Sequence, residues 1–340
     1  MLIDWLKIKY KYLKGLKKAY FQRENIVFQK NKQAYIMLAA NYNNLGDIAI
    51  TKAQEEFLKK NLPNDYEIII IPHDETYKKY LAIKKNLNKD TIITLIGGGN
   101  SGTLYEFIEE PRRFILKFFK ECKIISFPQS VVYNSDNKIY KEEFISLCTK
   151  CKNLTLVARE KKSYKVYKNL LKDKINILLV PDIVFTLDVE NKICKRKGIN
   201  YIFRNDMEKN ISEKKEKKVI DISKKYYSDY SFNDTCNVNI TGNGYEELDE
   251  FISIILKKEL VITDRLHGMI LSYVTDTPCI ALDNNNQKIS STYETWLSSQ
   301  SLVTMDDEIY KIEKFLENKK KGEKRDLKEE YIPLINSLLK

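Results

Sequence analysis

The segment Val261–Ser272 reads VITDRLHGMILS and joins two apolar runs through a short polar turn. The first run is typical of a buried strand and the second has helical spacing, so the segment predicts a strand, a loop and a helix. In an open α/β sheet, ligands bind beyond the carboxyl ends of the strands, where the next helix N-terminus favours an anion. The loop holds Asp264, Arg265 and His267, one of two histidines in the chain. Two interpretations stay open: an anion-binding and proton-transferring site, or a structural Arg265–Asp264 pair beside a histidine bonded to backbone.

Apolar runs that end in polar or glycine-containing turns recur along most of the chain, and stretches with helical spacing follow them. This alternation predicts an α/β protein with parallel sheets. The expected strands cover 33–40, 67–71, 91–96, 123–127, 154–158, 177–180, 201–203, 260–262 and 279–282. The lysine-rich stretch from Val189 to Lys197 is expected to link two such arrays. We therefore predict an N-terminal helix over 1–25, an N-terminal domain over 26–190 and a C-terminal domain over 191–340 that carries the Asp264 loop.

Two turns of the first array have compositions that suit a ligand site. Residues 41–47 read NYNNLGD, and Asp47 is well placed to cap the helix expected from Ile48. Because Asn and Gly tolerate left-handed conformations, this is either a well-made turn or a site that presents helix amides. The glycines at 97–99 let the backbone pass close to a ligand or to another strand, and their place in the array favours the ligand.

Composition narrows the classes of function. The chain carries a net charge of +11 and is 43% hydrophobic, which suits a folded protein with acidic partners such as phosphorylated metabolites or an anionic membrane surface. Nucleic acid is disfavoured, because the lysines are spread among acidic residues and no nucleic-acid-binding motif is present. Cys148 and Cys151 form a CxxC without a second pair or a nearby histidine, so we predict no metal site. The cysteines suit reduced thiols of a cytosolic protein, and we expect neither a signal peptide nor a membrane-spanning helix.

The first 21 residues predict a basic amphipathic helix. Lysines alternate there with apolar and aromatic side chains, namely Leu2, Trp5, Leu6, Ile8, Leu13, Leu16 and Tyr20. One interpretation is an interfacial helix on anionic lipid. The other is a helix packed on the body of the protein with a solvated lysine face, which is the commoner use of such helices.

Several motifs occur in a fixed order along the chain: NNLGDIA, IGGGN, SFPQS, ARExxSY, VPDIVF, RND, TDRLHGM and TPCIALD. Together they resemble the polysaccharide pyruvyl transferase family, especially its bacterial exopolysaccharide branch. The resemblance runs from about Tyr35 to Trp296. It implies a GT-B-like fold of two Rossmann-like domains with an interdomain cleft. Relatives often have Gly in place of Asn43 and a different sequence in place of 101–103, so the departures concern the acceptor more than the donor.

The resemblance implies that a pyruvyl group passes from phosphoenolpyruvate to a saccharide, usually as a ketal, without a cofactor or metal. The residues expected to act in catalysis are His267, Arg265 and Asp264. Those expected to bind the donor are Arg159, Arg265, Leu266, His267 and Arg204. The acceptor is expected to contact Asn44, Asp47, Gly98, Gly99 and Asn100. Lys288 is either a further phosphate ligand or an exposed loop lysine.

Two other functions stay open. The same architecture suits a glycosyltransferase that uses a nucleotide sugar, and a phosphoenolpyruvate-dependent product would separate the two. A non-catalytic saccharide-binding subunit of an envelope assembly complex would keep the fold without turnover, although the intact Asp264–His267 cluster argues against it. We expect the protein in the cytoplasm, with an acceptor that is free or lipid-linked. If the interfacial interpretation of residues 1–21 holds, the protein would be peripheral on the inner face of the cell membrane.

Overall fold

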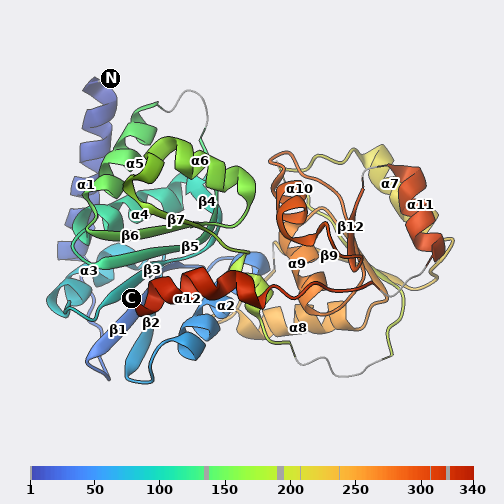
Figure 1. Ribbon diagram of the computed structural model, residues 1–340, viewed down its shortest axis with the longest axis horizontal. Coiled ribbons are helices and arrows are strands. Elements are labelled where there is room, and N and C mark those ends of the chain that lie inside the picture. Colours follow the sequence, from blue (N-terminus) through green and yellow to red (C-terminus); the bar gives the residue numbers. More distant parts are fainter. Residues whose placement is uncertain are drawn as a thin grey trace. The chain divides into compact units, whose positions relative to one another are not determined.

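The computed structural model describes most of the chain (Figure 1). The described residues are 2–133, 138–189, 195–206, 208–236, 238–306, 308–318 and 322–340. Their contacts divide the chain into two compact units, and each unit contains one parallel sheet. Unit 1 comprises Met1–Asn41, Ile50–Ile183 and Glu330–Lys340, and unit 2 comprises Tyr42–Ala49 and Val184–Glu329. The α/β class with parallel sheets is thus confirmed.

The unit boundaries differ in detail from the expected domains. The main boundary falls between Ile183 and Val184 instead of near residue 190, and residues 190–194 of the expected link lie outside the described part of the chain. The segment Tyr42–Ala49 belongs to unit 2 although the chain around it belongs to unit 1. The C-terminal segment from Glu330 returns to unit 1, because the Tyr331 hydroxyl donates to the Asp182 carbonyl and its ring packs near Phe57.

The sheet of unit 1 has the strand order β2-β1-β3-β5-β6-β7, with β4 paired to β5. Its strands are β1 (Lys32–Ala39), β2 (Tyr66–Pro72), β3 (Ile92–Leu95), β4 (Gly98–Gly102), β5 (Lys123–Val132), β6 (Asn153–Ala158) and β7 (Asn176–Leu179). Its helices are α1 (Leu2–Phe21), α3 (Thr76–Lys85), α4 (Glu106–Phe118), α5 (Lys138–Lys150), α6 (Lys161–Leu171) and α12 (Ile332–Leu339), with most of α2 (Leu45–Asn61). Strand β1, which lies between β2 and β3, is mostly apolar on both faces and buried along almost its whole length, as a parallel strand covered on both sides requires.

The glycine-rich segment after β3 forms a strand, not the expected ligand loop. Gly98 pairs with Gln129 of β5, and Gly102 pairs with Val132. Gly102 has φ +105°, and a Cβ placed there would lie 2.0 Å from the Val132 carbonyl oxygen. The close approach that these glycines permit is therefore made, at least at Gly102, to a neighbouring strand.

The sheet of unit 2 has the order β12-β11-β10-β8-β9, with every pair parallel. Its strands are β8 (Ile199–Ile202), β9 (Tyr230–Asn233), β10 (Leu260–Thr263), β11 (Cys279–Ala281) and β12 (Val303–Met305). Its helices are α7 (Glu213–Ser223), α8 (Tyr245–Leu256), α9 (Leu266–Val274), α10 (Lys288–Thr292) and α11 (Ile309–Asn318). The edge strands β9 and β12 were not expected from the sequence.

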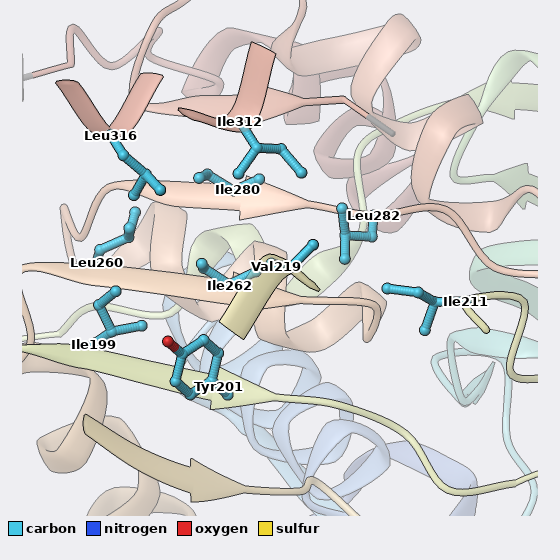
Figure 2. Packing of buried hydrophobic residues seen from close by; sticks show 10 residues of the cluster. All are labelled: Ile199, Tyr201, Ile211, Val219, Leu260, Ile262, Ile280, Leu282, Ile312 and Leu316. Atoms are coloured by element: carbon cyan, nitrogen blue, oxygen red, sulfur yellow. The ribbon is translucent and has the colours of Figure 1, made fainter. Parts of the chain in front are cut away.

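One face of this sheet forms a hydrophobic core with α7 and α11 (Figure 2). Alternate strand residues share a face, so Ile199 with Tyr201 and Leu260 with Ile262 point to the same side. The complete cluster consists of Ile199, Tyr201, Ile211, Val219, Leu260, Ile262, Ile280, Leu282, Ile312 and Leu316. The charged residues just beyond the strand ends are not part of this core.

In both sheets the strand order reverses next to the first strand. In unit 2, the chain passes from β8 to β9 on one side and then to β10 on the other, so the connections that follow β8 and β10 lead toward opposite edges of the sheet. In open α/β proteins, the carboxyl ends of the strands at such a switch point are where ligands bind. The expected cluster at Asp264 and Arg265 follows β10 and thus lies at this point. None of the helices that the structure describes has the length and apolar character needed to cross a membrane.

Candidate active site

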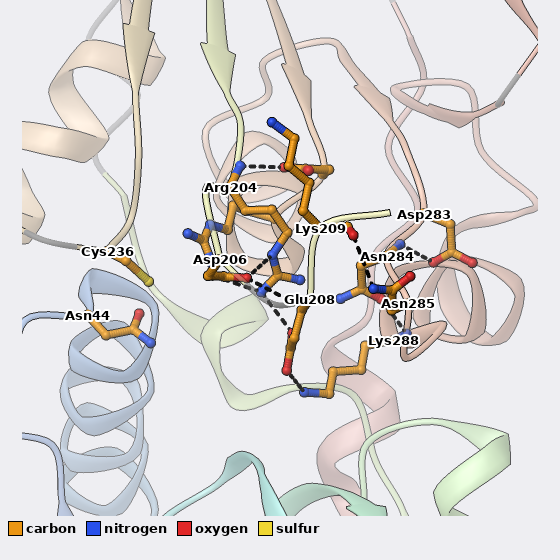
Figure 3. Close-up of polar contacts among 12 residues, drawn as sticks. Asn44, Arg204, Asp206, Glu208, Lys209, Cys236, Asp283, Asn284, Asn285 and Lys288 are labelled. Carbon is orange, nitrogen blue, oxygen red and sulfur yellow. Dashed lines mark hydrogen bonds and ion pairs between the residues drawn. The ribbon is translucent and has the colours of Figure 1, made fainter. Parts of the chain in front are cut away.

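Charged side chains collect at the carboxyl edge of the unit 2 sheet, because the strands are parallel and all end on that edge (Figure 3). The loop after β8 supplies Arg204, Asp206 and Glu208, β9 is followed by Asp234, β10 by Asp264, Arg265 and His267, and β11 by a loop that leads to Lys288. Five of the expected site residues are thus brought to one edge of the sheet from separate stretches of sequence: Arg204, Asp264, Arg265, His267 and Lys288.

Arg265 is the most completely bonded cation of this edge. Its Nε and Nη2 donate to the two carboxylate oxygens of Asp234 at 2.7 and 2.8 Å, and Nη1 donates to Asp206 at 2.6 Å. The planar guanidinium matches the fork of a carboxylate, as it would match a phosphate or a second carboxylate. Arg265 is thus oriented for bidentate anion binding, with protein carboxylates as its present partners.

The neighbouring cations are paired in the same way. Arg204 donates to Asp206 at 2.9 Å and lies 2.8 Å from a carboxylate oxygen of Glu208, whose other oxygen is 3.2 Å from the Lys288 ammonium. Burial by itself raises the pKa of Asp206, but Arg265, the Glu208 amide and Arg204 bring it below its ordinary value. Arg204, Arg265 and Lys288 therefore face Asp206, Glu208 and Asp234, and the six charges balance.

Asp264 is fully buried and holds two strand ends together. Its Oδ1 accepts a hydrogen bond of 2.8 Å from the Arg204 amide, which fastens the loop after β8 to the end of β10. Burial raises the pKa of this carboxyl to about 6, against the opposing effects of the Arg204 amide and the nearby cations. Asp264 positions the loop that carries Arg204, and its part in catalysis stays a prediction.

The turn from β10 into α9 is built around small and hydroxyl-bearing residues. Thr263 Oγ1 donates to the Ile202 carbonyl at 2.7 Å and accepts from the Arg265 amide at 3.0 Å. A Cβ at Gly268 would lie 2.4 Å from this hydroxyl oxygen, so glycine allows the helix to start this close to the strand. Arg265 is the N-cap residue and makes no side-chain cap. Leu266 therefore starts a helix whose first amides lack an intrahelical acceptor, an arrangement that favours anions.

His267 packs directly on Gly46. No local sequence pattern predicts this contact. A Cβ built on Gly46 would lie 2.2 Å from the His267 Nδ1 atom. The backbone around Gly46 is held in unit 2, because the Leu45 amide donates to the Thr235 carbonyl at 2.7 Å and Asn44 forms an antiparallel bridge with Cys236. Gly46 therefore determines where the imidazole lies.

Asn44, and not Asp47 as expected, caps α2. The helix begins at Leu45, and the Asn44 Oδ1 accepts from the Gly46 amide at 3.0 Å. Asp47 lies in the first turn, where its carboxylate accepts from the Asn44 side-chain amide at 2.8 Å and from the Tyr42 hydroxyl at 2.9 Å. Both residues thus form the first turn that supports Gly46, and their predicted contact with acceptor hydroxyls stays a prediction.

The other expected site residues belong to unit 1. Arg159 is fully buried and donates to Ser130 and to Asp182, each at 2.7 Å. Asn100 lies in β4 beside Gly98 and Gly99, and its side-chain and backbone oxygens both accept from Arg112. The predicted donor contact of Arg159 and acceptor contacts of 98–100 stay predictions.

A cavity of about 270 Å³ in unit 1 lies among α1, α3, α4 and α5 and shares no residue with the expected site. Its lining carries more acidic than basic side chains: Glu106, Glu109, Glu110 and Glu143 against Lys11 and Arg113. Both cations pair with those carboxylates. The cavity is therefore unsuited to a doubly anionic ligand. No cluster of three or more metal-ligating side chains occurs among the described residues, and the prediction that no metal is needed stays untested.

Comparisons with known proteins show which proteins this chain resembles. The family model of the polysaccharide pyruvyl transferases matches residues 44–286. General stress protein 30 of Bacillus subtilis is 32% identical over 90% of this chain and 91% of its own length. Pyruvyl transferase 1 of Schizosaccharomyces pombe is 28% identical over 77% of this chain and 69% of its own. The UDP-GlcNAc 2-epimerase of Neisseria meningitidis shares the fold, with a TM-score of 0.50, 9% identity and coverage of 90% and 99%.

Proposed function

Because this chain belongs to the polysaccharide pyruvyl transferase family, we propose that it transfers the pyruvyl group of phosphoenolpyruvate to two hydroxyls of a saccharide, forming a ketal. The family assignment covers pyruvyl transfer to a polysaccharide. The donor, the ketal product and a role in extracellular or cell-surface polysaccharide synthesis are our proposal. The observation that carries it is the group of guanidinium forks beside His267 at the switch point of the unit 2 sheet.

The two anionic groups of the proposed donor account for the arginines at this site. Phosphoenolpyruvate carries a phosphate and a carboxylate, and both match the planar guanidinium. In the structure the Arg265 guanidinium is held by Asp206 and Asp234, which are partly exposed to water. Donor binding would exchange these carboxylates for donor anions at Arg265 and Arg204. Lys288 would follow by leaving Glu208. The amides at the start of α9 add positive potential without a further side chain.

The reaction then requires one proton on carbon and two hydroxyl attacks. Protonation of the methylene carbon of the enol makes C2 electrophilic, and the first saccharide hydroxyl adds to it with loss of its proton. The second hydroxyl displaces phosphate and closes the ketal. We assign the proton transfer to His267, because an imidazole exchanges protons near neutral pH. The tight packing on Gly46 fixes the imidazole for this step.

The decisive experiment is product analysis by mass spectrometry with phosphoenolpyruvate and a panel of free and lipid-linked saccharides. We expect a mass gain of one pyruvyl ketal and release of inorganic phosphate, both dependent on phosphoenolpyruvate. A product that forms only with a nucleotide sugar would instead establish a glycosyltransferase. Absence of any turnover, with saccharide binding retained, would establish a binding subunit.

The histidine has a separate test. His267→Ala should abolish ketal formation while the thermal shift produced by phosphoenolpyruvate persists, because binding to the folded state raises its apparent stability. Full pyruvyl transfer by this variant would contradict the assigned role.

We also propose that the reaction takes place at the cytoplasmic face of the cell membrane, on lipid-linked saccharides.

A further inference from the structure

Helix α1 presents two apolar faces, and the residues that the structure describes cover one of them. Ile8, Tyr12, Gly15 and Ala19 are buried and follow one another at the spacing of a single helix face. This face packs on α3 and α4, and a Cβ at Gly15 would lie 2.6 Å from the Tyr77 ring. The inner face therefore accounts for the attachment of α1 to unit 1.

The outer face carries a second apolar stripe. Leu6, Tyr10, Leu13 and Tyr20 repeat at the same spacing and are between 55% and 67% exposed. The two stripes are two residues out of step, which places them roughly 200° apart around the helix. The attachment to unit 1 therefore cannot explain the outer stripe, and large side chains exposed in a row mark an interaction surface.

The charges beside the outer stripe are mostly positive, with Asp4 in the first turn of α1 lying 3.9 Å from Lys7. Between Trp5 and Arg23 the chain has seven basic residues and no acidic one, although it contains 47 acidic residues in all. Lys11 turns inward to Glu110, at 2.6 Å. The other lysines of this stretch remain exposed beside the stripe: Lys7, Lys9, Lys14, Lys17 and Lys18.

We propose that the outer face of α1, defined by Leu6, Tyr10, Leu13 and Tyr20 with the five exposed lysines, docks on an anionic lipid surface. Aliphatic and tyrosine side chains would enter the headgroup region while lysines at their flanks contact lipid phosphates. A second copy of α1 fits less well, because two such faces would bring their lysines together. The proposal goes beyond the pyruvyl transfer reaction and does not rest on it.

The test is co-sedimentation of the full chain with vesicles. Phosphatidylcholine vesicles that contain about one third phosphatidylglycerol should bind the protein at least about tenfold more tightly than pure phosphatidylcholine, and added salt should weaken the binding. Equal binding to both vesicles, or no binding to either, would overturn the proposal.

Two variants separate the apolar from the electrostatic contribution, and each has a matched control. Leu6→Gln combined with Leu13→Gln removes apolar side chains without adding charge and should lower vesicle binding at least about tenfold, whereas Tyr310→Gln combined with Ile332→Gln, at similarly exposed apolar positions of α11 and α12, should not. The triple change Lys7→Glu, Lys14→Glu and Lys18→Glu should also lower binding. The control triple Lys214→Glu, Lys217→Glu and Lys218→Glu on α7 should not.

Two further readouts decide between the remaining explanations. The thermal midpoint of the α1 variants should stay at the wild-type value, because the substituted side chains are exposed. Their pyruvyl transfer to a free saccharide should also be unchanged, so failure of the docking proposal is distinguishable from failure of the proposed reaction. If sedimentation showed a dimer that the Leu6→Gln and Leu13→Gln double variant dissociates, without lipid binding by the wild type, the face would be an interface between copies.

Discussion

The two units each contain a network of arginines and carboxylates, but the networks differ in their access to water. In unit 1, Arg112 and Arg113 pair with Glu109, and Arg113 also pairs with Glu143, where the carboxylate side chains are 4–6% exposed. In unit 2, the partners of Arg204 and Arg265 are 18–40% exposed. The first network joins α4 to α5, whereas the second lies at the carboxyl edge of a sheet.

This difference separates a structural role from a binding role for the same chemistry. A buried carboxylate that separates from its arginine is not hydrated in exchange, so breaking the pair costs much free energy. A partly exposed carboxylate regains water when it leaves, and another anion can take its place. The unit 1 network should therefore govern stability, and the unit 2 network should govern ligand binding.

The largest expected effect is on the unit 1 network. Glu109→Ala leaves Arg112 and Arg113 without their shared partner and should lower the free energy of unfolding by about 3–5 kcal/mol, measured by denaturant titration. The control Glu106→Ala removes an exposed partner of Lys11 and should change it by less than about 1 kcal/mol. Equal effects of the two changes would remove the distinction between buried and exposed pairs.

The next effect concerns Asp264. Burial raises its pKa from 3.8 to about 6, so its contribution to stability is full below pH 3.8 and is lost as the pH rises through about 6. Asp264→Asn should remove this loss and make the variant more stable than the wild type near pH 7 by up to about 3 kcal/mol, with no difference near pH 3.

Asp206 provides the control of opposite sign. Its pKa is lowered, so its contribution to stability is present above pH 3.8 and is lost as the pH falls through its folded-state value. Asp206→Asn should therefore be less stable than the wild type at neutral pH. Both pH profiles can be measured by thermal unfolding, and an Asp264→Asn profile parallel to that of the wild type would contradict the raised pKa.

A smaller change should separate placement of His267 from its chemistry. In Gly46→Ala the added methyl group displaces the imidazole, so kcat for pyruvyl transfer should fall about 100-fold while the imidazole itself is retained. Gly242→Ala is the control: a Cβ there meets no atom within 4 Å, so the φ of +57° should lower stability slightly while kcat stays at the wild-type value. Wild-type kcat in Gly46→Ala would show that the position of the imidazole is unimportant.

The smallest expected effect concerns Asp234, in the partly exposed network of unit 2. Asp234→Asn removes one charge from the partly exposed partner of Arg265 and should change the free energy of unfolding by less than about 1 kcal/mol. It should strengthen binding of phosphoenolpyruvate by about threefold to tenfold, because a neutral amide competes less than the Asp234 carboxylate with the donor anions for the Arg265 guanidinium. Glu143→Gln in unit 1 should show the reverse pattern, with lower stability and unchanged binding. Calorimetric titration measures the binding, and denaturant titration measures the free energy of unfolding.

The sequence sufficed for features that depend on local patterns. The buried strands β1 and β10 were predicted because an apolar run bounded by polar turns has few other uses. The Asp264–His267 cluster was placed at a strand end for the same reason. The amphipathic character of α1 was also visible, but which of its two apolar faces is covered was not.

Contacts between residues far apart in the chain had no such signal. Asp234 follows β9, an edge strand with exposed aromatic residues that alternates too weakly to be predicted, so the main partner of Arg265 was missed. The packing of Gly46 on His267 and the pairing of β4 with β5 depend on where distant backbones meet.

Sequence patterns were enough for the order of most strands and helices and for the arginines and histidine that follow the strands, because apolar periodicity and turn chemistry act over a few residues. The short strands β4, β9 and β12, the pairing of carboxylates with arginines and the water that those pairs retain became known from the folded structure. These depend on strand order and on the burial of each carboxylate, which arise when the parallel strands align and their ends converge on one edge.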